Sequence, residues 1–412
     1  MSAALRRSFD SLTVPNYRRY FAGQVVSLSG NWMQTVAEIW LILSLTGSGF
    51  AVGATTALQF LPLLLFGAWG GLLADRFAKR RLLVATQAAM SLPALGLLAI
   101  TATGVVEPWM VYSLVFARGA VNAVDNPTRQ SFVIEIVGSG RVVNAVSLNS
   151  VIVHSARMIG PAIAGVLIAT AGVEPCFALN AATFAVMIAA LARMDEDDLR
   201  PAPRVPREPG AVRAALRYVL RTPELAVPLG LMALVGTLGL NFQVILPLLA
   251  RFTFDGDATV YALLVSAMAA GSVIGALVSG ARARTGPEVL TGSALAFGLL
   301  ALVAAAAPSV AVAVPVLAGL GAASVTFGAA VNSWLQLEVA GQMRGRVMAL
   351  YSVVFLGSTP IGGPIAGWLS EAYDPRAALL LAASAGLAAA WASRTAFKRM
   401  AAAKRERADV AA

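Results

Sequence analysis

Long apolar runs separated by short polar segments recur along the whole chain. Many runs are roughly 20 residues long, the length that an α-helix needs to cross a bilayer core of about 30 Å. Helices are expected because lipid offers no partners for unpaired backbone N–H and C=O groups, and the alternation typical of a membrane barrel is absent. The pattern predicts an all-α membrane protein with twelve transmembrane helices, at residues 21–45, 50–74, 82–102, 109–132, 142–170, 175–191, 223–250, 259–280, 288–306, 310–335, 347–369 and 376–397.

Arginine and lysine are distributed unevenly over the segments between these spans. If the N-terminus is cytoplasmic and the spans alternate in direction, the outer segments hold only Arg251 and Arg376. Because cytoplasmic loops carry an excess of Lys and Arg, this bias predicts a multi-pass inner-membrane protein with both termini cytoplasmic. The cytoplasmic segments then hold Arg6, Arg7, Arg18, Arg19, Arg76, Lys79, Arg80, Arg81, Arg141, the region 193–221, Arg282, Arg284, Arg344, Arg346 and the tail at 394–407.

The composition changes in the middle of the chain. An acidic run at 194–198 is followed by four prolines among arginines, which is typical of a linker. We therefore expect a six-helix bundle at 1–193, a cytoplasmic linker at 194–222, and a second six-helix bundle with a basic cytoplasmic tail at 223–412.

The two halves of the sequence resemble each other. A shift of 202 positions places Ile159-Gly160 on Ile361-Gly362, and Ile163-Ala164-Gly165 on Ile365-Ala366-Gly367. A nearby shift places Gly67 and Gly71 on Gly271 and Gly275, pairs whose Gly-x-x-x-Gly spacing permits close helix packing. Two parallel six-helix repeats related by pseudo-symmetry are typical of one large class of transporters.

Composition excludes several other functions. Hydrophobic residues make up 58% of the chain and charged residues 13%, well below the charged content of a soluble domain. The net charge of +10 follows from basic residues beside the spans, so nucleic acid is not an expected partner. With one cysteine and one histidine, neither a disulfide framework nor a metal site is expected. The sequence shows no nucleotide-binding loop for ATP and no catalytic constellation, so we expect no enzyme and no cofactor, and we also expect no cleavable signal peptide.

The turn after the second span carries a recognisable motif. Gly71-Leu-Leu-Ala-Asp75-Arg76-Phe-Ala78-Lys79-Arg80-Arg81 resembles the hallmark loop of the major facilitator superfamily, although Ala78 replaces the usual glycine. The resemblance implies that Asp75 latches the two halves on the cytoplasmic side when the transporter faces outward, and Arg129 is its candidate partner. The corresponding turn of the second half lacks the aspartate, so the latch is asymmetric.

Other segments resemble one branch of the superfamily. Arg157-Met-Ile-Gly160-Pro161-Ala-Ile-Ala-Gly165 is similar to the glycine–proline motif of exporters, and it is equally consistent with a kinked packing helix. The segments 16–21, 45–48, 125–130 and 344–348 resemble the branch of enterobactin exporters, macrolide-type efflux pumps and lysophospholipid transporters. That branch is too diverse to imply a substrate.

Polar residues within the spans are the candidate site, since ionisable groups are costly in a membrane. They lie at helical spacing on two spans that border the cavity in the superfamily. The first span has Asn31, Gln34 and Glu38, and the fourth has Arg118, Asn122, Asp125 and Arg129. His154 and Arg157 on the fifth span, with Asn241 and Asn332 in the second half, complete the set. Two structural alternatives stay open: Glu38 neutralised by a buried arginine, and His154 as a satisfied core histidine.

These features together predict a secondary transporter that exports a small amphipathic compound, drug-like or siderophore-like, as a monomer working by alternating access. Glu38 is the expected proton carrier, because burial favours the protonated carboxyl whereas a nearby arginine favours the carboxylate. The alternatives are a lysophospholipid transporter and, outside transport, a membrane receptor. Its expected partners are the small-molecule substrate, the proton and the lipid bilayer.

Overall fold

The computed structural model describes residues 10–200, 211–281, 286–340 and 343–411, and the regular structure of these residues is helical. The first half has two short 3-10 helices, η1 (Asp10–Thr13) and η2 (Ser139–Arg141), and six long helices: α2 (Pro15–Thr46), α3 (Gly49–Arg76), α4 (Lys79–Ala102), α5 (Pro108–Val137), α6 (Val142–Ala171) and α7 (Glu174–Ala192). The second half has α8 (Ala211–Arg221), α9 (Pro223–Leu238), α10 (Phe242–Leu248), the π-helical turn η3 (Leu249–Thr253), α11 (Ala258–Ala281), α12 (Pro287–Ala305), α13 (Val310–Glu338), α14 (Arg344–Gly357), α15 (Thr359–Ala372) and α16 (Pro375–Ala411).

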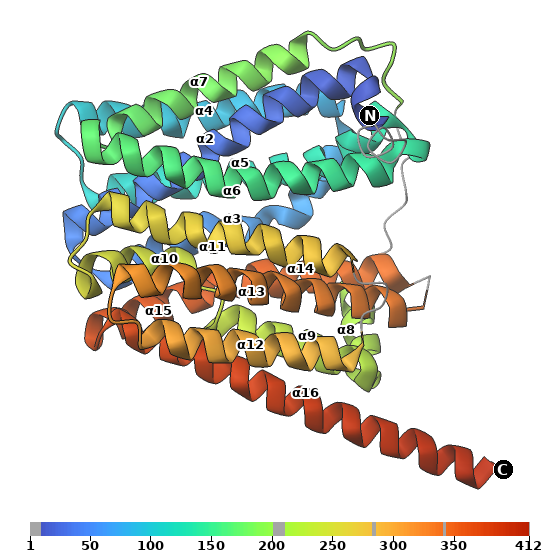
Figure 1. The fold of residues 1–412 in the computed structure, drawn as a ribbon. Coiled ribbons are helices and arrows are strands. Elements are labelled where there is room, and N and C mark those ends of the chain that lie inside the picture. Colours follow the sequence, from blue (N-terminus) through green and yellow to red (C-terminus); the bar gives the residue numbers. More distant parts are fainter. Residues whose placement is uncertain (1–9, 201–210, 282–285, 341–342, 412) are drawn as a thin grey trace. The chain divides into compact units, whose positions relative to one another are not determined.

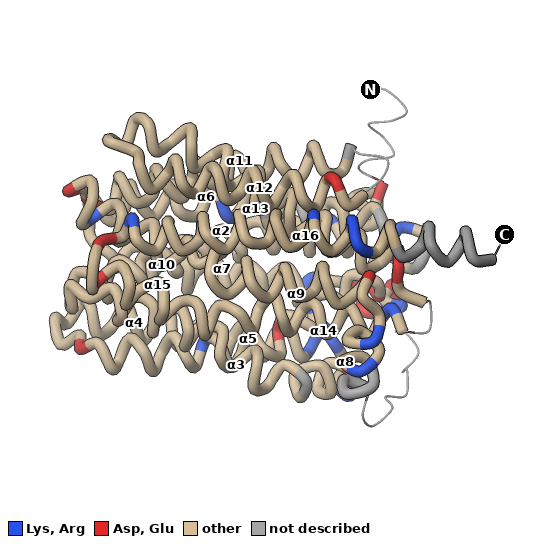
Figure 2. The backbone as a smooth tube through the Cα atoms, turned by 90° about the horizontal axis from the view of Figure 1, so that it is seen from below, with Lys and Arg blue, Asp and Glu red and all other residues tan. Residues whose placement is uncertain are grey.

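Ten segments of the described chain are long and apolar enough to span a membrane, and two of them combine shorter helices, α9 to η3 and α14 to α15. The remaining two long helices, α2 with 32 residues and α5 with 30, are long enough but carry more polar side chains. Together they give the twelve predicted spans, which confirms the all-α fold class. In Figure 2 the charged residues lie mainly near helix ends, as the cost of charge in lipid requires.

Two spans that the sequence predicts as continuous are interrupted. The seventh span breaks between α9 and α10, where the Asn241 side chain donates to the Thr237 carbonyl at 2.7 Å. The eleventh span breaks at Ser358, two residues before Pro360. Proline has no N–H to donate to the preceding turn of the helix, so this interruption has a local cause.

The described chain forms two compact units. Unit 1 comprises residues 1–47, 55–206 and 256–266, so it includes the first turns of α11. Within it α2 packs against α6 and α7, and α4 packs against α5 and α7, the blue-to-green helices of Figure 1. Unit 2 comprises residues 48–54, 207–255 and 267–412, and there α12 packs mainly against α16 and α13. The predicted bundles at 1–193 and 223–412 stay a prediction.

Glycines set the closest helix contacts in both units. A Cβ at Gly160 of α6 would lie 2.6 Å from the Ser29 carbonyl oxygen of α2, and one at Gly362 of α15 would lie 1.9 Å from the Thr237 carbonyl oxygen of α9. These glycines are the pair that the 202-residue shift superimposes. The internal repeat of the sequence therefore corresponds to equivalent backbone contacts in the two units.

One of the two predicted packing glycines of α3, Gly67, needs a correction. At Gly67 an added Cβ would meet only the Leu63 side chain, at an ordinary 3.7 Å, whereas at Gly70 it would lie 2.0 Å from the Ala123 carbonyl oxygen of α5. The counterpart in α11 is as predicted, because a Cβ at Gly271 or Gly275 would collide with the α13 backbone. Spacing alone could not say which glycine of α3 faces α5.

The second part of the predicted linker forms a helix that the sequence analysis missed. Residues 201–210 lie outside the described residues, as do Arg282 and Arg284. From residue 211 the chain forms α8, which buries Ala215 and Val219 and leaves Leu216 and Leu220 exposed. α8 packs against α14 and α9 within unit 2. Its apolar spacing is helical, a signal that the preceding prolines obscured.

Candidate functional site

A buried ion pair joins α2 and α5 in unit 1. Arg118 Nη2 lies 2.5 Å from Glu38 Oε2, and the exposed side-chain fractions are 8% for Arg118 and 1% for Glu38. The second carboxylate oxygen of Glu38 accepts from Gln34 Nε2 at 2.7 Å. Arg118 Nε is buried without a hydrogen-bond partner. The arrangement neutralises Glu38 yet leaves one donor of Arg118 unused.

The network extends from this pair to α7. Asn180 donates its side-chain N–H to Gln34 Oε1, and Arg118 Nη2 also reaches Thr35 Oγ1 at 3.4 Å. Asn180 is fully buried. Asn180 is not among the site residues predicted from the sequence, although an asparagine inside the apolar run 175–191 was the available signal. The site in unit 1 therefore draws on three helices, of which two were predicted to border it.

A second buried network surrounds Asp125 on α5. Asp125 Oδ1 accepts from Thr86 Oγ1 at 2.6 Å and from Gln87 Nε2 at 2.8 Å, both on α4. Arg129, one turn further along α5, contacts Asp125 and the Gln24 side chain of α2. Arg129 thus forms an ion pair with Asp125, and its role as the partner of Asp75 in the latch stays a prediction. An i,i+4 acid on the same helix meets the arginine without any movement of helices.

Arg157 on α6 is arranged differently from Arg118 and Arg129. Its Cζ atom lies 4.6 Å from the centroid of the Trp32 ring on α2, and its Nε is buried without a hydrogen-bond partner. Asn31 donates to the Ser27 carbonyl at 3.0 Å, and Asn122 is half-buried. The side chain of His154 lies outside the described residues.

The candidate residues of unit 2, Asn241 and Asn332, have uncharged amide side chains. Asn241 is buried at the break between α9 and α10, where its Oδ1 has no hydrogen-bond partner. Asn332 on α13 accepts from Gln336 Nε2 at 2.5 Å. The strongly polar part of the candidate site therefore lies in unit 1.

The hallmark motif divides into two groups of side chains. Asp75, Arg76 and Arg81 are exposed where α3 ends and α4 begins, and Gly71 is buried in the last turns of α3. Arg80 donates to the Leu191 and Ala192 carbonyls, each at 2.7 Å, and thereby caps the C-terminus of α7. A cation at this position also offsets the partial negative charge of the helix end. Lys79 pairs with Glu135 at the end of α5.

The glycine–proline motif packs α6 against two partners. Helix α6 remains helical through Pro161. Gly160 contacts α2, as described, and a Cβ at Gly165 would lie 2.2 Å from the Ala262 side chain in the first turns of α11. Close packing is therefore one function of this motif.

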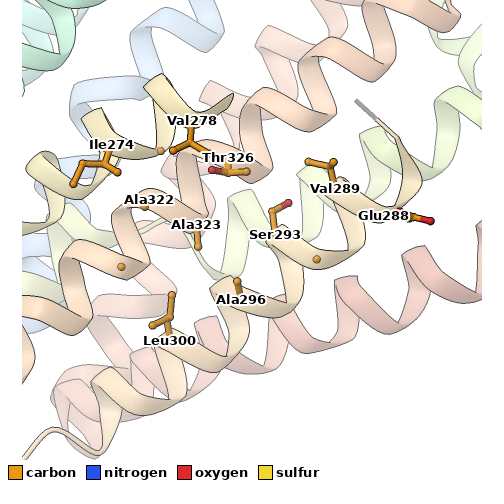
Figure 3. A pocket seen from close by; sticks show the side chains of 13 residues that line it. Ile274, Val278, Glu288, Val289, Ser293, Ala296, Leu300, Ala322, Ala323 and Thr326 are labelled. Carbon is orange, nitrogen blue, oxygen red and sulfur yellow. The ribbon is translucent and has the colours of Figure 1, made fainter. Parts of the chain in front are cut away.

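An apolar pocket lies elsewhere, within unit 2. It has a volume of about 500 Å³ and is lined by α11, α12 and α13, with Ile274, Leu300 and Thr326 among its side chains (Figure 3). None of the predicted site residues lines this pocket. Among the described residues, no group of three or more His, Cys, Asp or Glu side chains could hold a metal ion.

Comparison with protein families gives one match over nearly the whole chain. The model of a family described as transmembrane secretion effector matches residues 7–411. Among curated relatives, the staphyloferrin A transporter of Staphylococcus aureus is 25% identical over 63% of this chain and 65% of its own length, slightly less than two thirds. The enterobactin exporter EntS of Salmonella choleraesuis is 26% identical over 88% of this chain and 87% of its own length.

Solved structures share the fold at low sequence identity. The nucleoside transporter NupG is 13% identical, with a TM-score of 0.71 over 93% of this chain and 99% of that chain. A bacterial homolog of the human lysosomal transporter Spinster is 15% identical, with a TM-score of 0.71 over 93% of this chain and 96% of that chain. These likenesses agree with the predicted twelve-helix arrangement.

Proposed function

The chain belongs to the transmembrane secretion effector family of the major facilitator superfamily, and from this membership we propose that it is a proton-coupled exporter of a siderophore-like compound. The substrate class comes from relatives whose names record transport of staphyloferrin A and export of enterobactin. The proposed cycle is alternating access, driven by protons that enter as substrate leaves. An inner-membrane location with both termini cytoplasmic is part of the proposal and rests on the arginine distribution.

The observation that carries the coupling step is the buried pair of Glu38 and Arg118. Removing two charges from water is unfavourable unless they pair well, so the pair persists only while both partners are charged and in contact. Burial favours the neutral carboxyl and Arg118 favours the carboxylate. A movement that separates the two groups therefore favours proton uptake by Glu38.

The location of the pair also suits a role in coupling. Glu38 and Arg118 belong to α2 and α5, two long helices that are not among the ten most apolar candidate spans. A proton that enters with the electrical gradient contributes about 2.3 kcal/mol per 100 mV, enough to drive accumulation of a solute. The neighbouring Gln34, Asn180 and Thr35 keep the pair hydrogen-bonded, so the described network has few polar groups left unsatisfied.

Transport into inverted membrane vesicles tests the proposal. Vesicles that contain the protein are energised and offered enterobactin, staphyloferrin A and an uncharged amphipathic dye. We expect uphill accumulation of at least one siderophore that a protonophore abolishes. Vesicles with an equal amount of a control membrane protein should accumulate none. Accumulation that persists with the protonophore, or appears only for the dye, contradicts the proposal.

A further inference from the structure

The arginine of α6 lies against α2 because Gly160 permits the two helices to approach closely. A Cβ at Gly160 would lie 2.6 Å from the Ser29 carbonyl oxygen and 2.7 Å from Trp32 Cβ. Arg157 lies one turn earlier on α6 and so faces the same side of the helix. Its guanidinium carbon is 4.6 Å from the centroid of the Trp32 ring.

No described acidic side chain compensates the charge of Arg157. Arg118 pairs with Glu38 and Arg129 pairs with Asp125, whereas no ion pair or hydrogen bond to Arg157 is found in the described part of the chain. The sequence explains why: α6 contains no Asp or Glu, and the one acid of α2 is Glu38. The cation–π contact with Trp32 offsets only part of the cost of a charge within a membrane.

The side chains of Arg157 and Trp32 are both half-buried, so part of each stays accessible. A guanidinium presents paired N–H donors that match the two oxygens of a carboxylate. An indole ring beside it offers a flat apolar surface to the body of the same molecule. A charge without a protein partner, next to an accessible aromatic ring, is the arrangement that an amphipathic anion would complete.

We propose that Arg157 and Trp32 form a binding subsite for a carboxylate attached to an aromatic or apolar body. This inference rests on the proposed function, because it specifies the chemistry of the compound that is exported. Arg157 supplies the charge and the paired donors, and Trp32 supplies the apolar contact. Glu38 and Arg118 remain a separate, self-neutralising pair.

Equilibrium binding to the purified full chain in phosphatidylcholine nanodiscs tests the subsite. The probes are 1-naphthaleneacetate and its uncharged isostere 1-naphthaleneacetamide. We expect the wild-type protein to bind the carboxylate about tenfold more tightly, which is the effect of one charge-assisted interaction. Arg157→Gln should reduce that ratio to about one, Arg157→Lys should give an intermediate ratio, and Trp32→Ala should weaken both probes.

Arg217→Gln is the matched control, because it removes one positive charge from the exposed face of α8. It should keep the wild-type ratio. Thermal unfolding separates a binding role from a structural one: Arg157→Gln should not lower the melting temperature, since it removes an uncompensated charge. If Arg157→Gln fails to fold, Arg157→Lys still tests the ratio.

Three results would overturn the subsite. The first is no measurable preference for the carboxylate in the wild-type protein. The second is an unchanged preference in Arg157→Gln and Arg157→Lys. The third is a preference of the wild-type protein that disappears when phosphatidylglycerol is added to the nanodiscs. The last would assign the arginine to an anionic lipid headgroup. The binding measurement uses no gradient, so its result is independent of the vesicle assay. Uphill export together with an unchanged binding ratio in the Arg157 variants rejects the subsite alone. Absence of export rejects the proposed function.

Discussion

Glu38 and Arg118 form an ion pair whose partners lie 80 positions apart in sequence and on different helices. Each side chain is expensive to bury alone, and together they are neutral. Substitution of one partner therefore distinguishes a structural role of the pair from a role in coupling. A structural role is measured as a change in stability, and a coupling role as a change in proton flux.

Removing one partner should destabilise the protein more than removing both. Arg118→Gln leaves Glu38 buried without its cation, and we expect a loss of roughly 3 kcal/mol in the free energy of unfolding. The double variant Glu38→Gln with Arg118→Gln should recover much of this loss, since no charge is then left alone. Thermal unfolding of the purified variants measures both effects. Equal destabilisation by the single and double variants would mean that the pair contributes little.

A second prediction about a single residue concerns Asp75. We expect Asp75→Asn to reduce the rate of export several-fold while folding and membrane abundance stay unchanged, because the latch that the motif implies loses its charge. Glu107→Gln is the matched control, as it also removes one exposed acid, at the start of α5. Transport at wild-type rate by Asp75→Asn, measured at equal abundance, would remove the residue from the mechanism.

The sequence was informative about residue types but not about facing. It identified Glu38, Arg118 and Arg157 as ionisable residues within the spans, and it could not say which arginine pairs with the acid. That choice depends on the rotation of α5 and α6 about their axes, which packing contacts such as Gly160 on Ser29 determine. Asn180 was missed because an isolated amide in an apolar helix carries no periodic signal.

The helices themselves could be predicted closely. Apolar runs gave the positions of the twelve spans, since lipid imposes both length and composition. The breaks in the seventh and eleventh spans were not predicted, because both segments remain apolar across the break. α8 was not predicted because the prolines and arginines around it make the composition of this region polar.

The close contact of α11 with α13 gives a prediction at the scale of elements. A Cβ at Gly271 would lie 1.7 Å from the Ala318 carbonyl oxygen, and backbone cannot yield as a side chain can. We expect Gly271→Ala to cost about 1–3 kcal/mol of stability by forcing the helices apart. Gly292→Ala is the control, since no atom lies within 4 Å of its Cβ position and alanine favours helix. Equal melting temperatures for the two variants would contradict the role of Gly271.

At the scale of the whole molecule, the proposed orientation can be tested independently of transport. Cys176 is fully buried and is first replaced by alanine, which removes the one native thiol. Single cysteines are then introduced as Arg204→Cys, outside the described residues, and as Gly256→Cys, between η3 and α11. A membrane-impermeant maleimide applied to intact cells should label position 256 and not position 204. Labelling of position 204 would invert the topology.

The central claim is that Glu38 carries the proton that drives export. The most direct measurement is substrate-driven proton flux in proteoliposomes that contain wild-type protein or Glu38→Gln, with the siderophore that the vesicle assay identifies. Glutamine keeps the shape of the side chain and removes its change of charge. We expect that Glu38→Gln still exchanges substrate down its gradient but moves no protons with it. Coupled flux at the wild-type level in Glu38→Gln would contradict the account and leave Asp125 as the next acid to test.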